Sequence, residues 1–383
     1  MMATLLTACG GKKGDKNDAA FKIGGVGPLT GGAAIYGTAA ANGAQIAVDE
    51  INAKGGIQLE LRYEDDAHDA EKSVNAYNTL KDWGMQIFLG SVTSTPGVAT
   101  SVEANGDHMF YLTPSASSTD VLGGVANPLT GTVDIERKDT VFQMCFVDPN
   151  QGSASAQYIA DQKLGNKIAV IYKNDDVYST GIYQSFDAKA KELGLNVVSV
   201  TTFTDDTKSD FSVQLGDAQA NGADLVYLPM YYESAAQIFI QANVMGYAPK
   251  WFGVDGMDGI LTLDGFDTQL AEGVMLLTPF SPDAEDEATK AFVATYKEKY
   301  GEVPNQFAAD AYDCVYAIYN ALVAAEATPD MSASELCDLL IEQFTTMTFD
   351  GLTGSGVTWG KDGAVSKSPK GMVIQNGVYV GMD

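Results

Sequence analysis

Between Met85 and Leu122, two short apolar runs are each followed at once by hydroxyl side chains. The first run ends at Gly90 and the second at Pro114, and a segment of helical character separates them. This order predicts a strand, a turn, a helix, a strand and a second turn. Because ligands of open α/β sheets bind beyond the carboxyl ends of the strands, we expect the hydroxyls to face a ligand. A serine- and threonine-rich helix start would also suit a small carboxylate, although capping and turn formation alone would explain these residues equally well.

The rest of the chain continues the alternation of strand and helix. The pattern begins at Phe21, pauses in a Gly-, Pro- and Thr-rich loop at 123–139, and restarts near residue 141 as a second unit. Such alternation predicts parallel sheets with helices on both faces. Three helical segments follow between 286 and 345, and Asn376-Gly377 between two apolar runs predicts a type I′ hairpin. We therefore predict an α/β fold with two units and several crossings between them.

Charge and motifs exclude several classes of function. Fifty acidic against 23 basic residues give a net charge of −27, which argues against nucleic acid and anionic lipid as partners. No apolar run approaches the ~20 residues that cross a bilayer. The sequence has no dinucleotide fingerprint, Walker motif or G-x-S-x-G elbow, and only two histidines, His68 and His108. We expect no enzyme, cofactor or metal site, and we expect His68 to lie in a solvated turn beside a helix cap at Asp69.

The first twenty residues resemble a bacterial lipobox. A small residue precedes Cys9, and a polar stretch of Gly, Lys and Asp follows it. This arrangement is typical of lipoproteins, so Cys9 is the expected lipidation site and residues 1–20 the expected signal remnant and tether. Cys145, Cys314 and Cys337 form no C-x-x-C pair and are expected to be buried thiols, with a bond between Cys314 and Cys337 left open.

Aromatic and acidic side chains also follow predicted strands, at Tyr36, Tyr178, Tyr231 and Asp255. Together with the hydroxyls they would line one cleft between two lobes. Hydroxyl and N–H groups suit a carboxylate, an aspartate suits an ammonium group, and aromatic rings suit a side chain, so the combination predicts a site for a zwitterion. Taken singly, each tyrosine is better explained as a packing residue, and the alternative for Asp255 is an exposed turn residue.

Four segments carry a resemblance to a known family, namely Ile23–Ile57, Asn174–Gly181, Phe252–Met257 and Ala308–Ile318. Through them the chain resembles the leucine/isoleucine/valine-binding group of type I periplasmic binding proteins, which are substrate-binding proteins of branched-chain amino-acid ABC transporters. The resemblance implies two Rossmann-like lobes joined by a three-segment hinge that crosses near residues 141, 279 and 353. The implied division is 1–20 as tether, 21–141 with 280–352 as lobe 1, and 142–279 with 353–383 as lobe 2.

The resemblance also implies seven ligand-binding residues, which are Tyr36, Ser94, Ser115, Ser117, Tyr178, Tyr231 and Asp255. The three serines would hold the ligand carboxylate, Asp255 the ammonium group, and the tyrosines would wall the pocket. In some members a disulfide joins the two positions that His68 and Thr93 occupy here, so this chain lacks that link.

We therefore expect an extracellular or periplasmic binding protein, anchored to the membrane through its lipid only, that closes like a Venus flytrap on an amino acid. By resemblance the amino acid is branched-chain, the protein is a monomer, and its partner is an ABC permease. Two alternatives stay open. The same scaffold could bind another small carboxylate, such as an aromatic acid, an amide or a short peptide, or the chain could be an α/β enzyme.

Overall fold

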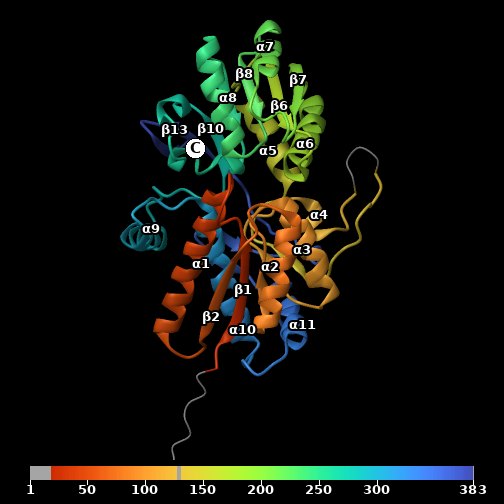
Figure 1. The fold of residues 1–383 in the computed structure, drawn as a ribbon, viewed down its shortest axis with the longest axis vertical. Helices are drawn as coiled ribbons and strands as arrows, with labels where there is room; N and C mark the ends of the chain where they lie inside the picture. Colours follow the sequence, from red (N-terminus) through yellow and green to blue (C-terminus); the bar gives the residue numbers. More distant parts are fainter. Residues whose placement is uncertain (1–18, 127–130, 383) are drawn as a thin grey trace, which may run out of the picture.

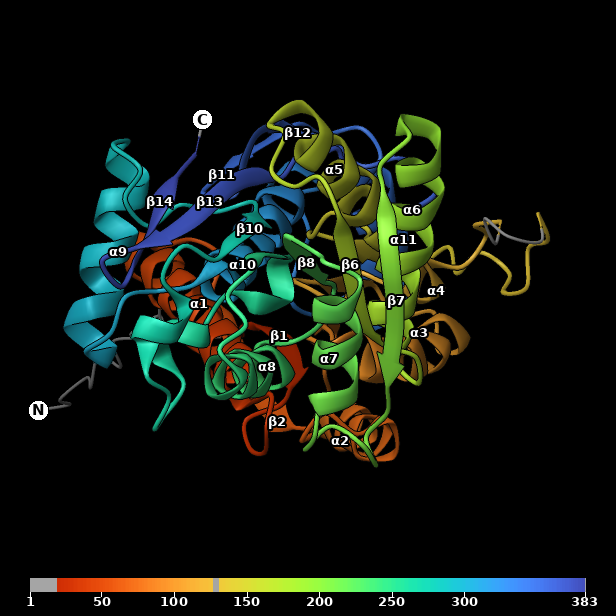
Figure 2. The same ribbon diagram turned by 90° about the horizontal axis from the view of Figure 1, so that it is seen from above.

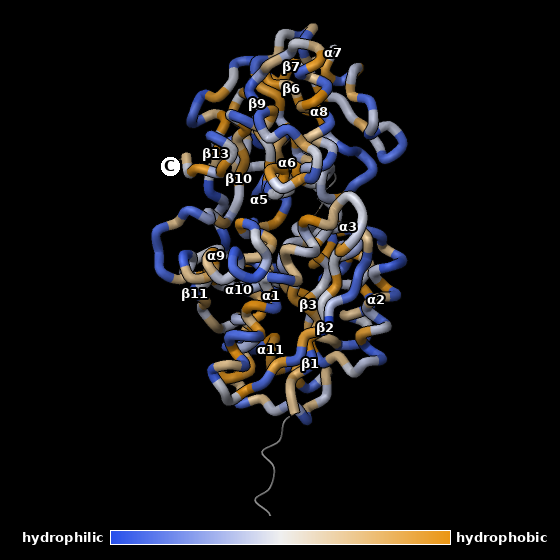
Figure 3. The backbone as a smooth tube through the Cα atoms, turned by 60° about the vertical axis from the view of Figure 1, so that its left-hand side comes forward, coloured by the Kyte–Doolittle hydropathy of each residue, from blue (hydrophilic) through white to orange (hydrophobic). Residues whose placement is uncertain are grey.

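The computed structural model describes residues 19–126 and 131–382. Two α/β lobes are stacked along the long axis of the molecule (Figure 1), each built on its own sheet. Hydrophobic segments run along the strands inside each lobe, and hydrophilic segments lie mainly on the outside (Figure 3). This arrangement confirms the predicted α/β fold with two units.

Lobe 1 contains a five-stranded parallel sheet in the order β2-β1-β3-β4-β5. Its strands are β1 (Phe21–Gly27), β2 (Leu59–Asp65), β3 (Ile87–Leu89), β4 (Tyr111–Thr113) and β5 (Val141–Gln143). Its helices are α1 (Ala34–Lys54), α2 (Ala70–Trp83), α3 (Ser94–Gly106), α4 (Thr119–Leu122), α9 (Glu287–Tyr300), α10 (Gln306–Ala324) and α11 (Ala333–Phe344). The predicted strand, turn, helix, strand and turn of 85–122 are thus confirmed as β3, α3 and β4.

Helix α1 packs closely against α10, which is far away in the sequence. Gly43 lies where the two helices meet, and a Cβ atom at this position would lie only 2.0 Å from the carbonyl oxygen of Ala308. The helices approach this closely because Gly43 has no side chain. The contact fixes the start of α1, which bears Tyr36, relative to the start of α10.

Lobe 2 contains a seven-stranded sheet in the order β14-β13-β10-β9-β8-β6-β7. Its strands are β6 (Ile168–Lys173), β7 (Val197–Phe203), β8 (Leu225–Leu228), β9 (Lys250–Gly253), β10 (Met275–Thr278), β13 (Lys370–Gln375) and β14 (Val378–Gly381). Its helices are α5 (Asp148–Asp161), α6 (Val177–Leu193), α7 (Ser212–Ala220), α8 (Tyr232–Met245) and the 3₁₀ turns η1 (Asp255–Met257), η2 (Ile260–Thr262) and η3 (Thr268–Ala271). Figure 2 looks down on this lobe, with α5 and α6 on one side of the sheet and α7 and α8 on the other.

Strands β13 and β14 form the predicted hairpin. They pair antiparallel, with Gln375 opposite Val378, so that two residues make the turn. Asn376 has φ 54° and Gly377 has φ 74°. Positive φ at both central residues defines a type I′ turn, whose twist matches that of the flanking strands.

The chain passes between the lobes three times, after β5, after β10, and between β12 and β13. Before the third passage, β11 (Phe349–Gly351) and β12 (Gly354–Val357) form a separate two-stranded sheet. Within this passage Lys367 donates from Nζ to Asp310 Oδ1 of α10 at 2.6 Å, and also to the hydroxyl of Thr353. The residue limits predicted for the two lobes stay a prediction.

In the part of the chain that the structure describes, no helix is long and apolar enough to cross a bilayer. Cys145, Cys314 and Cys337 are all buried and not bonded to one another, so the possible bond between Cys314 and Cys337 is not formed. Cys9, the expected lipidation site, lies outside the described residues.

Candidate ligand-binding site

The seven predicted ligand residues lie where the two lobes face each other. In lobe 1, Tyr36 lies in the first turn of α1, Ser94 begins α3, and Ser115 and Ser117 follow β4. In lobe 2, Tyr178 lies in the first turn of α6, Tyr231 directly precedes α8, and Asp255 begins η1. Six of them are less than a tenth exposed, and Tyr231 is half-buried. All seven come from the ends of strands or the starts of helices, because β-α connections gather at one edge of a parallel sheet.

Asp255 is the acidic centre of the site. Its side chain is 4% exposed, and its Oδ1 accepts a hydrogen bond of 2.5 Å from the Tyr178 hydroxyl. The same hydroxyl accepts from the backbone N–H of Gly256 at 2.8 Å. Burial raises the pKa of Asp255 to about 7, although the bond from Tyr178 acts in the opposite direction. Asp255 is therefore not an exposed turn residue, which was the alternative explanation of its sequence position.

The tyrosines form one aromatic cluster that bridges the lobes. The rings of Tyr178 and Tyr231 stack at 4.6 Å with an interplanar angle of 4°, and Tyr36 of lobe 1 lies 5.6 Å from Tyr231. Tyr36 donates to the carbonyl oxygen of Gly256, and Tyr232 donates from its hydroxyl to the carbonyl oxygen of Gly32 at 2.6 Å. Both of these hydrogen bonds connect one lobe with the other, so the lobes are in contact at this cluster.

Ser94 of lobe 1 faces this aromatic cluster at Tyr231. Ser94 Oγ accepts from the backbone N–H of Ser118 at 3.2 Å, and α3 has no side-chain cap at its start. The hydroxyl of Tyr231 faces the backbone of Ser94 and, among the described residues, has no hydrogen-bond partner. Donors therefore gather at the N-terminus of α3, where the helix dipole also favours a negative charge.

Gln151 of α5 connects the two halves of the site. Its Nε2 donates to the Ser117 hydroxyl, and its Oε1 accepts from the backbone N–H of Asp255, each at 3.4 Å. From lobe 1, Gln306 donates from Nε2 to the carbonyl oxygen of Asp255 at 2.7 Å. Neither glutamine was predicted from the sequence. The signal for Gln151 was available, since it lies shortly after β5 in the same kind of strand-to-helix connection as the predicted residues.

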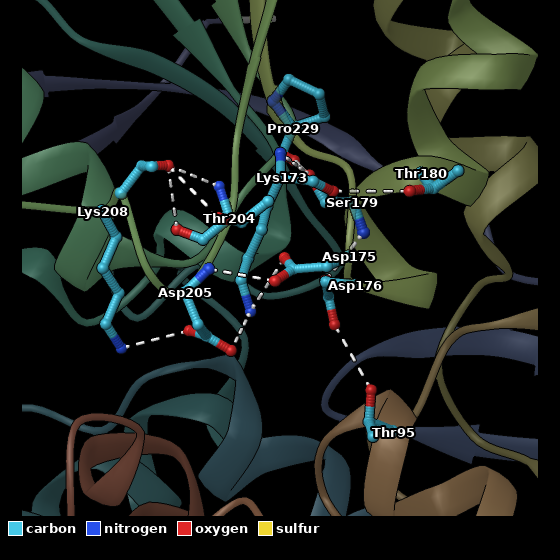
Figure 4. Close-up of polar contacts among 11 residues, drawn as sticks. Thr95, Lys173, Asp175, Asp176, Ser179, Thr180, Thr204, Asp205, Lys208 and Pro229 are labelled. Carbon is cyan, nitrogen blue, oxygen red and sulfur yellow. Dashed lines mark hydrogen bonds and ion pairs between the residues drawn. The ribbon is translucent and has the colours of Figure 1, made fainter.

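A further contact between the lobes joins α3 to α6 (Figure 4). Asp176 caps α6 by accepting from the backbone N–H of Ser179 at 2.9 Å. Its other oxygen accepts from the hydroxyl of Thr95 across the lobes at 3.5 Å. Lys173 lies close by but pairs with Asp205 at 3.0 Å and with Asp175 at 3.6 Å. The acidic group at the start of α6 therefore also faces the positive end of α3.

His68 is not the solvated residue that the sequence predicted. Its Nδ1 lies 2.8 Å from the Thr93 hydroxyl, and its ring meets the ring of Tyr231 edge-on at 5.5 Å. Burial lowers its pKa to about 4, so the ring is neutral at pH 7. The prediction failed because the fold brings the turn after β2 against the start of α3. The predicted cap is confirmed, since Asp69 Oδ1 accepts from Lys72 N at 2.8 Å.

A cleft of about 600 Å³ opens between the lobes, and none of the seven predicted residues lines it. Its wall includes Ser118, Thr119 and Asp120 of lobe 1 and Asp176, Gly181 and Gln184 of lobe 2. Two wall residues, Ser118 and Val177, adjoin Ser117 and Tyr178 along the chain. The structure thus brings the tyrosines, Asp255, Ser94 and Ser117 together. Ser115 follows β4 nearby in the chain, and the cleft adjoins the cluster at Ser117 and Tyr178.

Comparison with known proteins agrees with this geometry. The sequence pattern of the periplasmic binding protein family matches residues 20–376. The chain belongs to this family. Among curated proteins, it is 27% identical over 318 residues to the Leu/Ile/Val-binding protein homolog 3 of Brucella melitensis, with 81% of each chain covered. It is also 27% identical over 281 residues to the leucine-specific-binding protein of Salmonella typhimurium, with 72% of each covered.

Two solved structures extend the comparison to the fold. The leucine binding protein LivK of Thermotoga maritima superposes with a TM-score of 0.81 at 26% identity, over 95% of this chain and 98% of that one. The branched-chain amino acid binding protein LivJ of Streptococcus pneumoniae, solved with isoleucine, gives 0.80 at 28% identity over 94% and 97%. The chain is thus a periplasmic binding protein of the type I fold and not an enzyme, which rules out the alternative of an α/β enzyme.

Proposed function

We propose that this protein captures a branched-chain amino acid between its lobes and delivers it to an ABC permease. The observation that carries the proposal is the polarity of the site. Hydrogen-bond donors gather at the start of α3 in lobe 1, while the buried carboxyl of Asp255 lies in lobe 2. An α-amino acid presents a carboxylate and an ammonium group on one carbon atom, which fits these two halves. The names of the relatives, which bind leucine, isoleucine and valine, support the choice of ligand.

Each half of the site has a defined role in this proposal. Ser94, Ser115 and the Tyr231 hydroxyl hold the carboxylate together with the helix N-terminus, and Ser117 lies between them and Asp255. Asp255 binds the ammonium group. Tyr36 and Tyr178 surround the aliphatic side chain. Burying an ammonium group is favourable only when a carboxylate or other acceptors compensate for the lost water.

Ligand contacts to both lobes would stabilise the closed arrangement, in the way that hinge proteins close around their ligands. The three passages between the lobes are the hinge segments in this proposal, and the lobes are 21–141 with 280–352 and 142–279 with 353–383. The permease would recognise the closed form. A lipid on Cys9 would hold the protein at the outer face of the membrane.

Isothermal calorimetry against the twenty amino acids tests the ligand. We expect binding of leucine, isoleucine or valine, and no binding to any of the twenty would contradict the proposal. Asp255→Ala removes the partner of a buried ammonium group, which costs about 3 kcal/mol or more and weakens binding at least about 100-fold. Asp264→Ala, which replaces an exposed aspartate of the same lobe, is the control and should bind as the unmodified protein does. An unchanged affinity of Asp255→Ala would remove Asp255 from the site.

Mass spectrometry of protein extracted from membranes tests the anchor separately. We expect Cys9 to carry a lipid, and an unmodified Cys9 would contradict the anchor without affecting the ligand site.

A further inference from the structure

A buried glutamine, Gln143, ends strand β5 of lobe 1, at the point where the chain first leaves that lobe. Its side chain is 0% exposed, and its Nε2 donates to two backbone carbonyl oxygens, of Ala116 at 2.6 Å and of Ser118 at 3.0 Å. These two residues stand on either side of Ser117 in the turn after β4. The side chain of Gln143 therefore holds the backbone before and after a predicted ligand residue.

The two carbonyl oxygens also fix the orientation of the Gln143 amide. Only its NH₂ group can donate, so a flipped amide would place oxygen against oxygen. In this orientation Oε1 is buried and has no hydrogen-bond partner among the described residues. A buried acceptor without a partner costs free energy that an apolar side chain would avoid. The contribution of Gln143 therefore lies in the two hydrogen bonds that it donates to the turn.

The backbone of Gln143 is fixed as well. Its N–H donates to the carbonyl oxygen of Gly363 at 3.0 Å, and its carbonyl oxygen accepts from Trp359 Nε1 at 2.8 Å. Both partners belong to the third passage between the lobes. On the other side, Gln143 lies opposite Thr113 in the parallel pairing of β5 with β4. The amide thus extends from a main chain that is held on both sides, so it can keep the turn in place.

Thr113 orders the first half of the same turn. Its hydroxyl accepts from the backbone N–H groups of Ser115 at 3.2 Å and Ala116 at 2.9 Å. The hydroxyl also donates to the carbonyl oxygen of Ser91 at 2.8 Å. Thr113, Ser91 and Gln143 all belong to lobe 1, so these bonds do not depend on the position of lobe 2. The turn is therefore ordered by its own lobe before a ligand arrives.

We propose that Gln143 is a positioning residue of the ligand-binding site, which fixes the turn at 115–118 so that the hydroxyl of Ser117 faces the ligand. This inference rests on the proposed capture of an amino acid. A binding group that is already ordered loses less conformational entropy when the ligand binds, so a fixed turn raises the affinity. Without Gln143, the carbonyl groups of Ala116 and Ser118 lose their buried donor, and the turn must rearrange to find another.

The test compares Gln143→Met with Gln214→Met by calorimetry with leucine. Gln214 of α7 is a matched control. It is also buried, donates from Nε2 to the carbonyl oxygen of Thr202 at 2.9 Å, and has no partner for Oε1 in the described part of the chain. Helix α7 carries none of the predicted ligand residues.

We expect Gln143→Met to bind leucine at least about tenfold more weakly, which corresponds to the loss of about one hydrogen bond. Gln214→Met should bind leucine within about twofold of the unmodified protein. Binding by Gln143→Met within the same twofold range, or an equal loss in both variants, would overturn the inference but leave the proposed function intact. No amino-acid binding by the unmodified protein would overturn both.

A double-mutant cycle shows whether Gln143 acts through Ser117. In the Ser117→Ala protein, adding Gln143→Met should weaken leucine binding by less than about threefold, because the hydroxyl that Gln143 positions is gone. A merely structural role would cost the same factor with and without this hydroxyl. The full loss in the Ser117→Ala background would therefore overturn the inference.

A measurement on the unmodified protein covers the case that Gln143→Met does not fold. Hydrogen–deuterium exchange followed by mass spectrometry reports how well the amides of residues 115–118 are protected without leucine. We expect slow exchange, because Gln143 and Thr113 hold the turn in place. Exchange at the rate of an unstructured peptide would show that the turn is not ordered in advance, and this result would also overturn the inference.

Discussion

Gly43→Ala should destabilise the protein and weaken ligand binding at the same time. The new Cβ atom would lie 2.0 Å from the carbonyl oxygen of Ala308, which is backbone and cannot turn away. Helices α1 and α10 must move apart, and overpacking of this kind costs about 1–3 kcal/mol, with this contact at the upper end. Alanine recovers up to about 1 kcal/mol through its helix propensity. We expect a net loss of about 2 kcal/mol, or a fall of about 2–3 °C in melting temperature for a chain of 383 residues.

The matched control is Gly216→Ala in α7. Gly216 is also inside a helix, but a Cβ atom there would meet nothing within 4 Å. Its replacement should raise stability by up to about 1 kcal/mol. Thermal unfolding followed by circular dichroism measures both variants, and calorimetry with leucine measures binding, since the starts of α1 and α10 carry Tyr36 and Gln306. Equal melting temperatures for the two variants would refute the argument from close packing.

Two further predictions concern buried charges. Lys367→Met leaves Asp310 without its cation, in a pair whose side chains are 1% and 2% exposed, and should lower the free energy of unfolding in urea by about 3–5 kcal/mol. The control is Lys297→Met, at an exposed lysine, which should change stability by less than about 0.5 kcal/mol. Similar losses in both variants would contradict the prediction. Burial raises the pKa of Asp66 and of Asp255 to about 7 in the folded protein, above the unfolded value. The folded state therefore binds these protons more tightly, and stability is lost as pH rises through 7. The melting temperature should rise from pH 8 to pH 5, and a fall over that range would contradict it.

The sequence predicted the fold well because the residue types at turns and the alternation of strands and helices indicated the same architecture. Apolar runs ending in glycine or hydroxyl residues gave the strands of lobe 1, and Asn376-Gly377 gave the hairpin, since few other residues adopt positive φ at both positions. The limits of the lobes depend on contacts between distant segments, such as Lys367 with Asp310, which no local pattern encodes.

The site was predicted less completely. Residue type and resemblance identified Asp255 and the tyrosines, and the structure gathers them into one cluster. Gln151 was missed because an Asp-Pro-Asn-Gln stretch before a helix looks like ordinary capping. Only the fold shows that its side chain bonds both the Ser117 hydroxyl and the backbone of Asp255. His68 was misjudged for the same reason, because its burial depends on Thr93 and on Tyr231 from the opposite lobe.

The interleaving of the two lobes along the chain has a consequence for protein synthesis. All five strands of the first sheet are made by residue 143, but α10, which packs against α1 beside it, is made only at 306–324. Strand β10 likewise waits for its neighbour β13 at 370–375. When the ribosome has reached residue 300, α10 and β13 have not yet been synthesised. Each lobe of the nascent chain therefore still exposes the apolar surface that one of these segments will cover. Such a chain stays vulnerable to aggregation until translation is almost finished.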